Sequence, residues 1–259
     1  MAKFQCNVIS YTLKRTVDIT VVIPTPTIPD SMGMGGNPPS HVPEAKYPVL
    51  YLLHGMGNNH ATWSGYSNVE FFAEERNIAV VMISGENKAY INHEGGDQFY
   101  DFVAEELPQF VKAMFPISDR VEDTYIAGLS MGGYGTLVHA FSHPERFAAY
   151  GSFSGAPSIG SNGQEGPSDI RFRPLDMAKE VYARGDKLPK GYIACGEEDF
   201  LYQNNVDFKN ELEKLGADFT WVSVPNFTHE WRFWNLQVEA FLDWIPRTDV
   251  YAAKGKRKI

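Results

Sequence analysis

Six short and nearly continuous apolar runs recur along the chain, and segments with helical periodicity separate most of them. Apolar runs of this kind are typical of strands that are buried on both faces. The runs are PVLYLLHG (48–55), NIAVVMISG (77–85), TYIAGLS (124–130), RFAAYGSFSG (146–155), GYIACGEED (191–199) and FTWVSVPN (219–226). Strands that alternate with helices predict βαβ units, a mostly parallel sheet and helices on both of its faces. The predicted fold class is therefore α/β.

The remaining segments complete a single predicted domain, 1–259. Helices are expected over 68–76, 97–114, 131–142, 204–215 and 232–244. The alternating stretches KFQCNVISYTL and RTVDITVVIP predict an antiparallel strand pair at the N-terminus. A Pro/Gly-rich stretch, 24–43, is too long for an ordinary turn and is expected to be a surface excursion without an assigned role. An insertion at 156–189 follows the end of a strand and ends in a short helical stretch, so it is expected to form a small lid.

Composition excludes several classes of function. The 259 residues are 43% hydrophobic and carry a net charge of −9, which argues against a nucleic-acid partner. No apolar run reaches the roughly 20 residues that span a membrane, and no secretory signal is visible, so a cytoplasmic location is expected. The two cysteines, Cys6 and Cys195, predict buried thiols, with neither a disulfide nor a metal site. The basic C-terminus KGKRKI is interpreted as a frayed, solvated tail, and assembly into a homo-oligomer is left open.

One short motif carries chemistry. Residues 128–132, Gly-Leu-Ser-Met-Gly, fit Gly-x-Ser-x-Gly between an apolar run and a helical segment, which is the nucleophile elbow pattern. In such a turn the serine is strained, and the residues two positions away on either side have no room for a Cβ. The turn would present Ser130 Oγ at the carboxyl edge of the sheet, beside the positive end of a helix. The competing interpretation is a tight turn with a spectator serine.

A serine hydroxyl needs a base to act as a nucleophile. Downstream of Ser130 the histidines are His139, His143 and His229. The first two belong to or end the helix that carries the motif, and they are interpreted as surface or satisfied helix residues. His229 lies on a loop after the last predicted strand, at the carboxyl edge of the sheet. We therefore predict His229 as the general base.

The base in turn needs a carboxylate that orients it, and in this fold the acid should lie between the serine and the histidine in the chain. The predicted strand between them ends with Glu197, Glu198 and Asp199. Three consecutive side chains in a turn point in different directions, so one acid is expected. We predict Asp199, with Glu198 as the fallback.

A tetrahedral oxyanion needs two backbone N–H donors. One is expected from Met131, directly after the serine, and the other from Met56, in the loop HGMGNN after the first apolar run of the sheet. His54 precedes the glycine of that loop and is expected to shape it rather than to act as a base. Among the aromatic residues near these positions, Trp63 and Trp231 are predicted to line the substrate pocket.

Five blocks of sequence together resemble a known family: LLHGMGNNHATWSGYSNVE, QFYDFVAEELPQFV, GLSMGGYGTL, CGEEDFLYQNN and THEW. The resemblance covers about 47–244, interrupted at 156–189. It is to the esterase family of α/β-hydrolases that includes tributyrin esterases, S-formylglutathione hydrolases, the antigen 85 mycolyltransferases, and acetyl xylan and feruloyl esterases. The tributyrin esterase branch looks closest.

The resemblance implies an α/β-hydrolase fold, with Ser130, Asp199 and His229 as triad and the amides of Met56 and Met131 as oxyanion donors. The S-formylglutathione hydrolase branch carries a Thr- and Cys-containing oxyanion loop, which HGMGNN does not match, so a glutathione thioester is less favoured.

The expected activity is that of a serine carboxylesterase without a cofactor. No cationic cluster marks a pocket for a charged leaving group, so the expected partner is a small neutral ester, with a short acyl chain or an acetylated or feruloylated carbohydrate. The alternatives are an acyltransferase with a sugar or lipid acceptor, an S-formylglutathione hydrolase, and a catalytically silent binding protein.

Overall fold

A computed structural model describes residues 1–34, 38–157 and 172–259 of the chain. Its centre is a sheet of eight strands in the order β1-β2-β4-β3-β5-β6-β7-β8. The strands are β1 (Ala2–Ser10), β2 (Arg15–Ile23), β3 (Val49–Leu53), β4 (Ala79–Ile83), β5 (Thr124–Leu129), β6 (Ala149–Phe153), β7 (Lys190–Gly196) and β8 (Phe219–Val224). β1 and β2 pair antiparallel, as do β2 and β4, and the pairs from β4 to β8 are parallel. The predicted α/β class and the predicted N-terminal strand pair are both confirmed.

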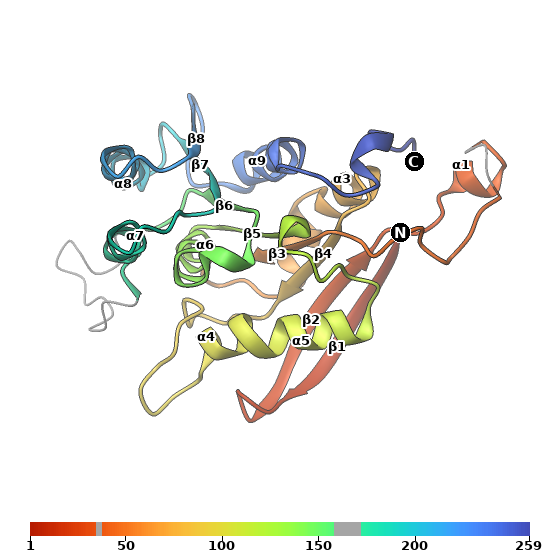
Figure 1. Cartoon of the computed structure of the whole chain (residues 1–259), viewed down its shortest axis with the longest axis horizontal. Helices are drawn as coiled ribbons and strands as arrows, with labels where there is room; N and C mark the ends of the chain where they lie inside the picture. Colours follow the sequence, from red (N-terminus) through yellow and green to blue (C-terminus); the bar gives the residue numbers. More distant parts are fainter. Residues whose placement is uncertain (35–37, 158–171) are drawn as a thin grey trace.

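Helices cover both faces of the sheet (Figure 1). The α-helices and the π-helix are α1 (Ile28–Ser31), which projects to the side, and α2 (Thr62–Tyr66), α3 (Val69–Glu75), α4 (Phe99–Asp101), the π-helix η1 (Phe102–Glu106), α5 (Leu107–Met114), α6 (Met131–Ser142), α7 (Pro174–Ala183), α8 (Tyr202–Lys214) and α9 (Trp231–Trp244). Apolar side chains of α5, α6, α7 and α8 form one core with one face of the sheet. Those of α2, α3 and α9 form a second core on the other face. The alternation of strands and helices in the sequence reflects these two layers.

The helix predicted over 97–114 contains a π-helical turn, η1, which the sequence analysis did not anticipate. The buried Glu106 in this turn accepts hydrogen bonds from Ser10 Oγ (2.7 Å) and from the N–H groups of Tyr11 (3.0 Å) and Thr12 (2.9 Å). Burial opposes the charge of Glu106, but these hydrogen bonds outweigh it and lower the pKa of the carboxyl group. The π turn thus directs Glu106 to the turn between β1 and β2.

The last strand, β8, differs from the expectation of a strand buried on both faces. All six of its residues are partly exposed, because β8 ends the sheet and pairs with β7. The apolar run FTWVSV therefore reflects an edge strand whose side chains are half covered.

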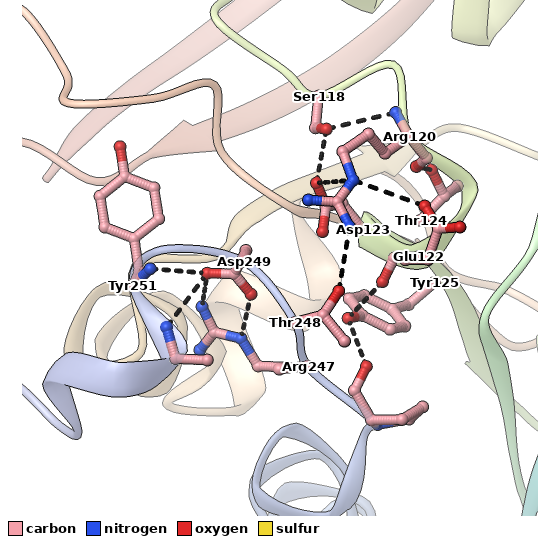
Figure 2. Close-up of polar contacts among 12 residues, drawn as sticks. Ser118, Arg120, Glu122, Asp123, Thr124, Tyr125, Arg247, Thr248, Asp249 and Tyr251 are labelled. Carbon is pink, nitrogen blue, oxygen red and sulfur yellow. Dashed lines mark hydrogen bonds and ion pairs between the residues drawn. The ribbon is translucent and has the colours of Figure 1, made fainter.

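The C-terminal segment is anchored to the body of the molecule. After α9, the Arg247 guanidinium pairs with Asp249, and the Tyr125 hydroxyl donates to the Pro246 carbonyl (Figure 2). Arg257 then donates to Asp30 of α1 (2.6 Å), to the Asn77 amide oxygen and to the Thr25 carbonyl, and its own N–H bonds to the Glu75 carbonyl. The expectation of a frayed tail is therefore wrong as far as Arg257.

The same contacts fix the start of the Pro/Gly-rich stretch. Thr27 and Asp30 cap α1 reciprocally, so each side chain satisfies a backbone N–H of the other end of the turn. Figure 1 shows α1 projecting to the side of the molecule on which the C-terminus ends. Residues 35–37 of this stretch lie outside the described residues.

Much of the predicted lid, 156–189, lies outside the described residues, which omit 158–171. Its described helix, α7, packs against α6 and α8 and contributes Met177, Ala178 and Val181 to the core. A lid over the site remains a prediction. Across the described ranges, no helix is long and apolar enough to cross a membrane.

Candidate active site

The predicted elbow lies between β5 and α6. Ser130 has φ 52° and ψ −116°, in the region that L-residues rarely adopt. A Cβ on Gly128 would lie 2.4 Å from the Gly132 carbonyl oxygen, and one on Gly132 would lie 2.4 Å from the Leu53 carbonyl oxygen. The two glycines are required because the turn brings backbone against backbone, as the motif predicted.

Two other elements bring polar side chains to this serine. His229, on the loop between β8 and α9, has Nε2 3.0 Å from Ser130 Oγ. Its other ring nitrogen, Nδ1, is 2.8 Å from Asp199 Oδ2, on the turn after β7. The structure thus brings together Ser130, His229 and Asp199, three residues that three different strand ends position at the carboxyl edge of the sheet.

The hydrogen bonds define the state of the imidazole. The buried Asp199 carboxylate accepts from Nδ1–H, which leaves Nε2 free to accept the Ser130 hydroxyl proton. Burial would raise the pKa of Asp199, but hydrogen bonds from His229, from the Leu201 N–H (2.8 Å) and from Ser154 together lower it. Asp199 therefore stays ionised and holds one tautomer of His229.

One residue beside this chain of hydrogen bonds, Ser154, was not anticipated from the sequence. Ser154 directly follows the last residue of β6; it hydrogen-bonds the Asp199 carboxyl group and accepts from Trp234 Nε1 at 3.1 Å. Its backbone has φ 45°, which marks a second constrained position beside the site. The signal in the sequence that could have identified Ser154 is its place at the carboxyl end of β6, the strand next to β5.

Aromatic rings hold His229 from two sides. The Phe200 ring centroid lies 4.6 Å from that of His229, and the Trp234 ring meets the imidazole edge-on at 4.9 Å. Trp234 is buried, whereas Phe200 is 75% exposed. The imidazole is thus fixed on its inner side and covered by a solvent-facing ring on its outer side.

The loop after β3 lies against the nucleophile. A Cβ on Gly55 would lie 3.4 Å from Ser130 Cβ, so the backbone that leads to Met56 passes beside the serine. The Gly57 N–H donates to Asn87 Oδ1 at 2.7 Å, which fixes the loop. In the described ranges, neither the Met56 nor the Met131 N–H donates a hydrogen bond to another residue.

His54 organises the start of this loop from within the core. Its Nε2 accepts from the Gly85 N–H at 2.9 Å, so Nδ1 carries the proton and donates to the Gly55 carbonyl at 2.7 Å. Burial lowers the pKa of His54 to about 4, so the ring stays neutral. The expected structural role of His54 is confirmed by these contacts.

The two tryptophans predicted to line the pocket lie at different depths. Trp63 is 1% exposed, and its indole N–H donates to the Leu53 carbonyl at 3.0 Å. Its side chain belongs to the core, and the expected contact with a substrate is not supported for it. Trp231 is partly exposed; it meets Trp63 edge-on and stacks on the exposed Tyr66 at 5.2 Å. A surface beside the site is therefore formed by Trp231 and Tyr66.

The remaining candidates lie elsewhere. The backbone N–H of Glu198, the fallback acid, donates to the Phe227 carbonyl, and the residue is exposed. His139 lies in the second half of α6 and contacts the Tyr90 carbonyl, and His143 directly follows the helix and contacts the Tyr100 hydroxyl. Within the described part of the chain, no group of three or more His, Cys, Asp or Glu residues could hold a metal ion.

The sheet order and the elbow define the class of protein as an α/β-hydrolase. The model of the esterase family, described as "Putative esterase", matches residues 27–243. An acetyl esterase of Caldicellulosiruptor saccharolyticus is 31% identical over 271 residues, which cover 95% of this chain and 99% of the relative. The chain therefore belongs to this esterase family, as the sequence blocks predicted.

Solved structures agree with this assignment. Fluorophosphonate-binding serine hydrolase F (FphF) of Staphylococcus aureus is similar with a TM-score of 0.82 and 27% identity, over 94% of this chain and 97% of that one. An S-formylglutathione hydrolase (FrmB) of the same organism is similar with a TM-score of 0.80 and 27% identity, over 94% and 98%. These relatives do not test the expected place in the tributyrin esterase branch, which stays a prediction.

Proposed function

We propose that the protein is a serine carboxylesterase that hydrolyses small neutral esters through an acyl-enzyme. The observation that carries the proposal is the continuous chain of hydrogen bonds from Ser130 Oγ through the His229 ring to Asp199. A base within hydrogen-bond reach of the hydroxyl, itself oriented by a carboxylate, is the arrangement that activates a serine.

The mechanism follows from these positions. Ser130 Oγ attacks the ester carbonyl while His229 Nε2 takes its proton, and the ionised Asp199 stabilises the imidazolium. The oxyanion accepts hydrogen bonds from the Met56 and Met131 N–H groups, which have no partner of their own in the described ranges. His229 then gives its proton to the departing alcohol, and water attacks the acyl-enzyme by the same route in reverse.

A short acyl group is the preferred substrate feature. The support is the acetyl esterase that is 31% identical over nearly the whole chain. The exposed pair of Trp231 and Tyr66 offers stacked rings beside the site, on which the sugar of an acetylated carbohydrate or the aryl group of a feruloyl ester would pack.

The experiment is a rate series on p-nitrophenyl esters of rising acyl length, together with acetylated sugars and methyl ferulate. We expect kcat/KM to be highest for acetyl and butyryl esters and to fall with longer chains. A maximum at long chains would refute the short-acyl proposal. The Ser130→Ala variant is the control, and failure of a fluorophosphonate to label wild-type Ser130 would favour a silent binding protein.

Two alternatives are measured in the same series. S-formylglutathione is included because a hydrolase of this thioester is 27% identical across the chain. A kcat/KM for S-formylglutathione far above that for acetyl esters would make it the preferred substrate. Product analysis with added sugar or long-chain alcohols detects acyl transfer, which is the acyltransferase alternative.

A further inference from the structure

The side chain of Ser154 lies on the opposite face of the sheet from the one that strand alternation predicts. In β6, Tyr150 belongs to the core that α6 covers, and a Cβ on Gly133 of α6 would lie 2.9 Å from the Ser152 hydroxyl oxygen. Residues two apart in a strand share a face, so Ser154 would be expected on the α6 side as well. Instead it contacts Trp234 of α9, which belongs to the core on the other face.

The backbone of Ser154 accounts for this position. Its φ of 45° lies in the left-handed region, which interrupts the alternation of the strand and turns the side chain to the other face. The N–H of Ser154 still donates to the Ala194 carbonyl of β7 at 2.7 Å, so the residue is held at the end of the sheet. Strain of this kind persists where the surrounding structure imposes it, and it clusters at active sites.

The hydrogen bonds of the buried Ser154 hydroxyl have a fixed direction. An indole N–H can only donate, so Ser154 Oγ accepts from Trp234 Nε1 at 3.1 Å. An ionised carboxylate can only accept, so the Ser154 O–H donates to Asp199. The Cys195 thiol also contacts this hydroxyl, but burial raises the pKa of Cys195 to about 12, and a neutral thiol is a weaker acceptor than a carboxylate. The donors are thus ordered from Trp234 through Ser154 to Asp199.

Trp234 also contacts the other partner of the Asp199 carboxylate. Its ring meets the His229 imidazole edge-on, with centroids 4.9 Å apart and an interplanar angle of 85°. His229 Nδ1 in turn lies 2.8 Å from Asp199 Oδ2. Ser154, Asp199, His229 and Trp234 therefore form a closed ring of contacts, and a movement of Asp199 would break this ring on both sides.

We propose that Ser154 is a positioning residue of the triad, and that Trp234 directs the Ser154 hydroxyl proton toward Asp199. The proposal rests on the proposed esterase function, since it assigns Ser154 a role in the reaction at Ser130. The Ser154 hydroxyl fixes the rotation of the carboxylate, so that Asp199 Oδ2 stays aligned with His229 Nδ1 during proton transfer. Because Ser154 is fully buried, it acts on the rate of the chemical step and not on binding of the ester.

The first test measures kcat and KM for p-nitrophenyl acetate. Ser154→Ala loses one hydrogen bond to a charged group, so we expect kcat to fall about tenfold and KM to change less than twofold. Ser154→Gly loses the same hydroxyl but tolerates the positive φ, so its kcat should fall equally while it unfolds at a higher temperature than Ser154→Ala. Ser152→Ala is the matched control, because that hydroxyl is also buried in β6 and has no partner among the described residues. It should leave both constants unchanged.

A double-mutant cycle separates positioning from a general structural effect. Ser154→Ala is repeated in the Asp199→Asn background, and the acylation rate is measured in single turnovers at high enzyme concentration. If Ser154 acts through the Asp199 carboxylate, loss of its hydroxyl should cost less than twofold in that background. A residue that only supports the fold would cost the same tenfold in both backgrounds, and that result would overturn the proposal.

A second readout requires no turnover. The proton on His229 Nδ1 is followed by NMR in ¹⁵N-labelled protein, and its resonance is assigned by its absence in His229→Gln. A less constrained carboxylate makes a weaker hydrogen bond, so we expect Ser154→Ala to shift this resonance upfield and to speed its exchange with water. Ser152→Ala should leave the resonance in place. An unchanged resonance in folded Ser154→Ala protein would overturn the proposal.

Failure of the positioning role and failure of the proposed function give different results. If the wild-type protein hydrolyses none of the esters but the His229 resonance responds to Ser154→Ala, the proposed function is wrong and the positioning of Asp199 by Ser154 is supported. If the wild-type protein is an esterase and folded Ser154→Gly keeps its kcat, the positioning role is wrong and the proposed function stands.

Discussion

At the scale of single residues, the site depends on close backbone contacts that a short motif encodes. Gly132→Ala places a methyl group 2.4 Å from the Leu53 carbonyl oxygen, so the elbow must shift. We expect a loss of about 1–3 kcal/mol in the free energy of unfolding, together with a fall in kcat. Urea denaturation and p-nitrophenyl acetate hydrolysis measure the two effects.

The matched control is Gly65→Ala in α2, where an added Cβ meets nothing within 4 Å. This change should be neutral or stabilise the protein, because alanine is the better helix former. Equal losses in the two variants would mean that the elbow tolerates a side chain.

The choice between neighbouring acids is also testable. Asp199→Asn keeps the shape of the side chain but presents the wrong hydrogen-bonding group to His229 Nδ1, so we expect kcat to fall about 10³- to 10⁴-fold. Glu198→Gln, on the exposed neighbour, should keep nearly full activity. Steady-state kinetics at pH 7 on both variants decide the matter, and the reverse order of effects would assign the acid to Glu198.

Site residues whose role depends on contacts nearby in the fold could be predicted from the sequence alone. The strain at Ser130 and the two bare glycines follow from a five-residue pattern, because the contacts that require them lie within that turn or against the adjacent strand. Ser154 was missed because its role depends on β6 lying between β5 and β7, which places its hydroxyl near both Asp199 and Trp234. Trp63 was predicted to line the pocket but is buried, because its nearness in sequence to the loop after β3 does not determine how deeply its side chain lies.

At the scale of elements, helices and strands with strong periodicity were predicted closely, and their irregularities were not. The π-helix η1 adds one residue to a helical turn so that Glu106 can reach the turn after β1, a contact across 94–96 residues that no helical period encodes. The sequence of the edge strand β8 resembles that of a buried strand because most of its partly covered side chains are apolar.

Loss of the contacts that anchor the C-terminal segment has a clear expected effect on stability. Arg257→Ala deletes the bonds to Asp30, Asn77 and the Thr25 carbonyl, and we expect about 1 kcal/mol of lost stability and faster cleavage within 24–34 by a broad-specificity protease. Lys258→Ala, next along the exposed chain, is the control and should change neither. If residues 24–34 are cleaved no faster in the Arg257 variant than in the wild-type protein, the contacts of Arg257 do not hold α1 in place.

At the scale of the whole molecule, buried neutral histidines make stability depend on pH. Burial lowers the pKa of His54 to about 4 and that of His139 to about 3. Because the unfolded chain binds more protons than the folded chain below pH 6.5, the free energy of unfolding falls as the pH decreases from about 6.5 toward those values. The fall is about 1.4 kcal/mol per pH unit for each such ring.

The check is the slope of unfolding free energy between pH 6.5 and 4.5. His139→Gln keeps a donor for the Tyr90 carbonyl and removes one titrating ring, so the slope should become shallower by about 1.4 kcal/mol per pH unit. Replacing the exposed His41 in the same way is the control and should leave the slope unchanged. An unaltered slope in the His139 variant would mean that this ring is already charged in the folded protein at pH 4.5.

The unusual backbone at Ser130 has a cost that persists in the resting protein. A residue held at such angles stores on the order of 1–3 kcal/mol, and the surrounding packing must supply that energy at all times, with or without substrate. A glycine at this position would relax the tension and leave the molecule inert. The chain therefore keeps its reactive hydroxyl by giving up part of its thermal robustness.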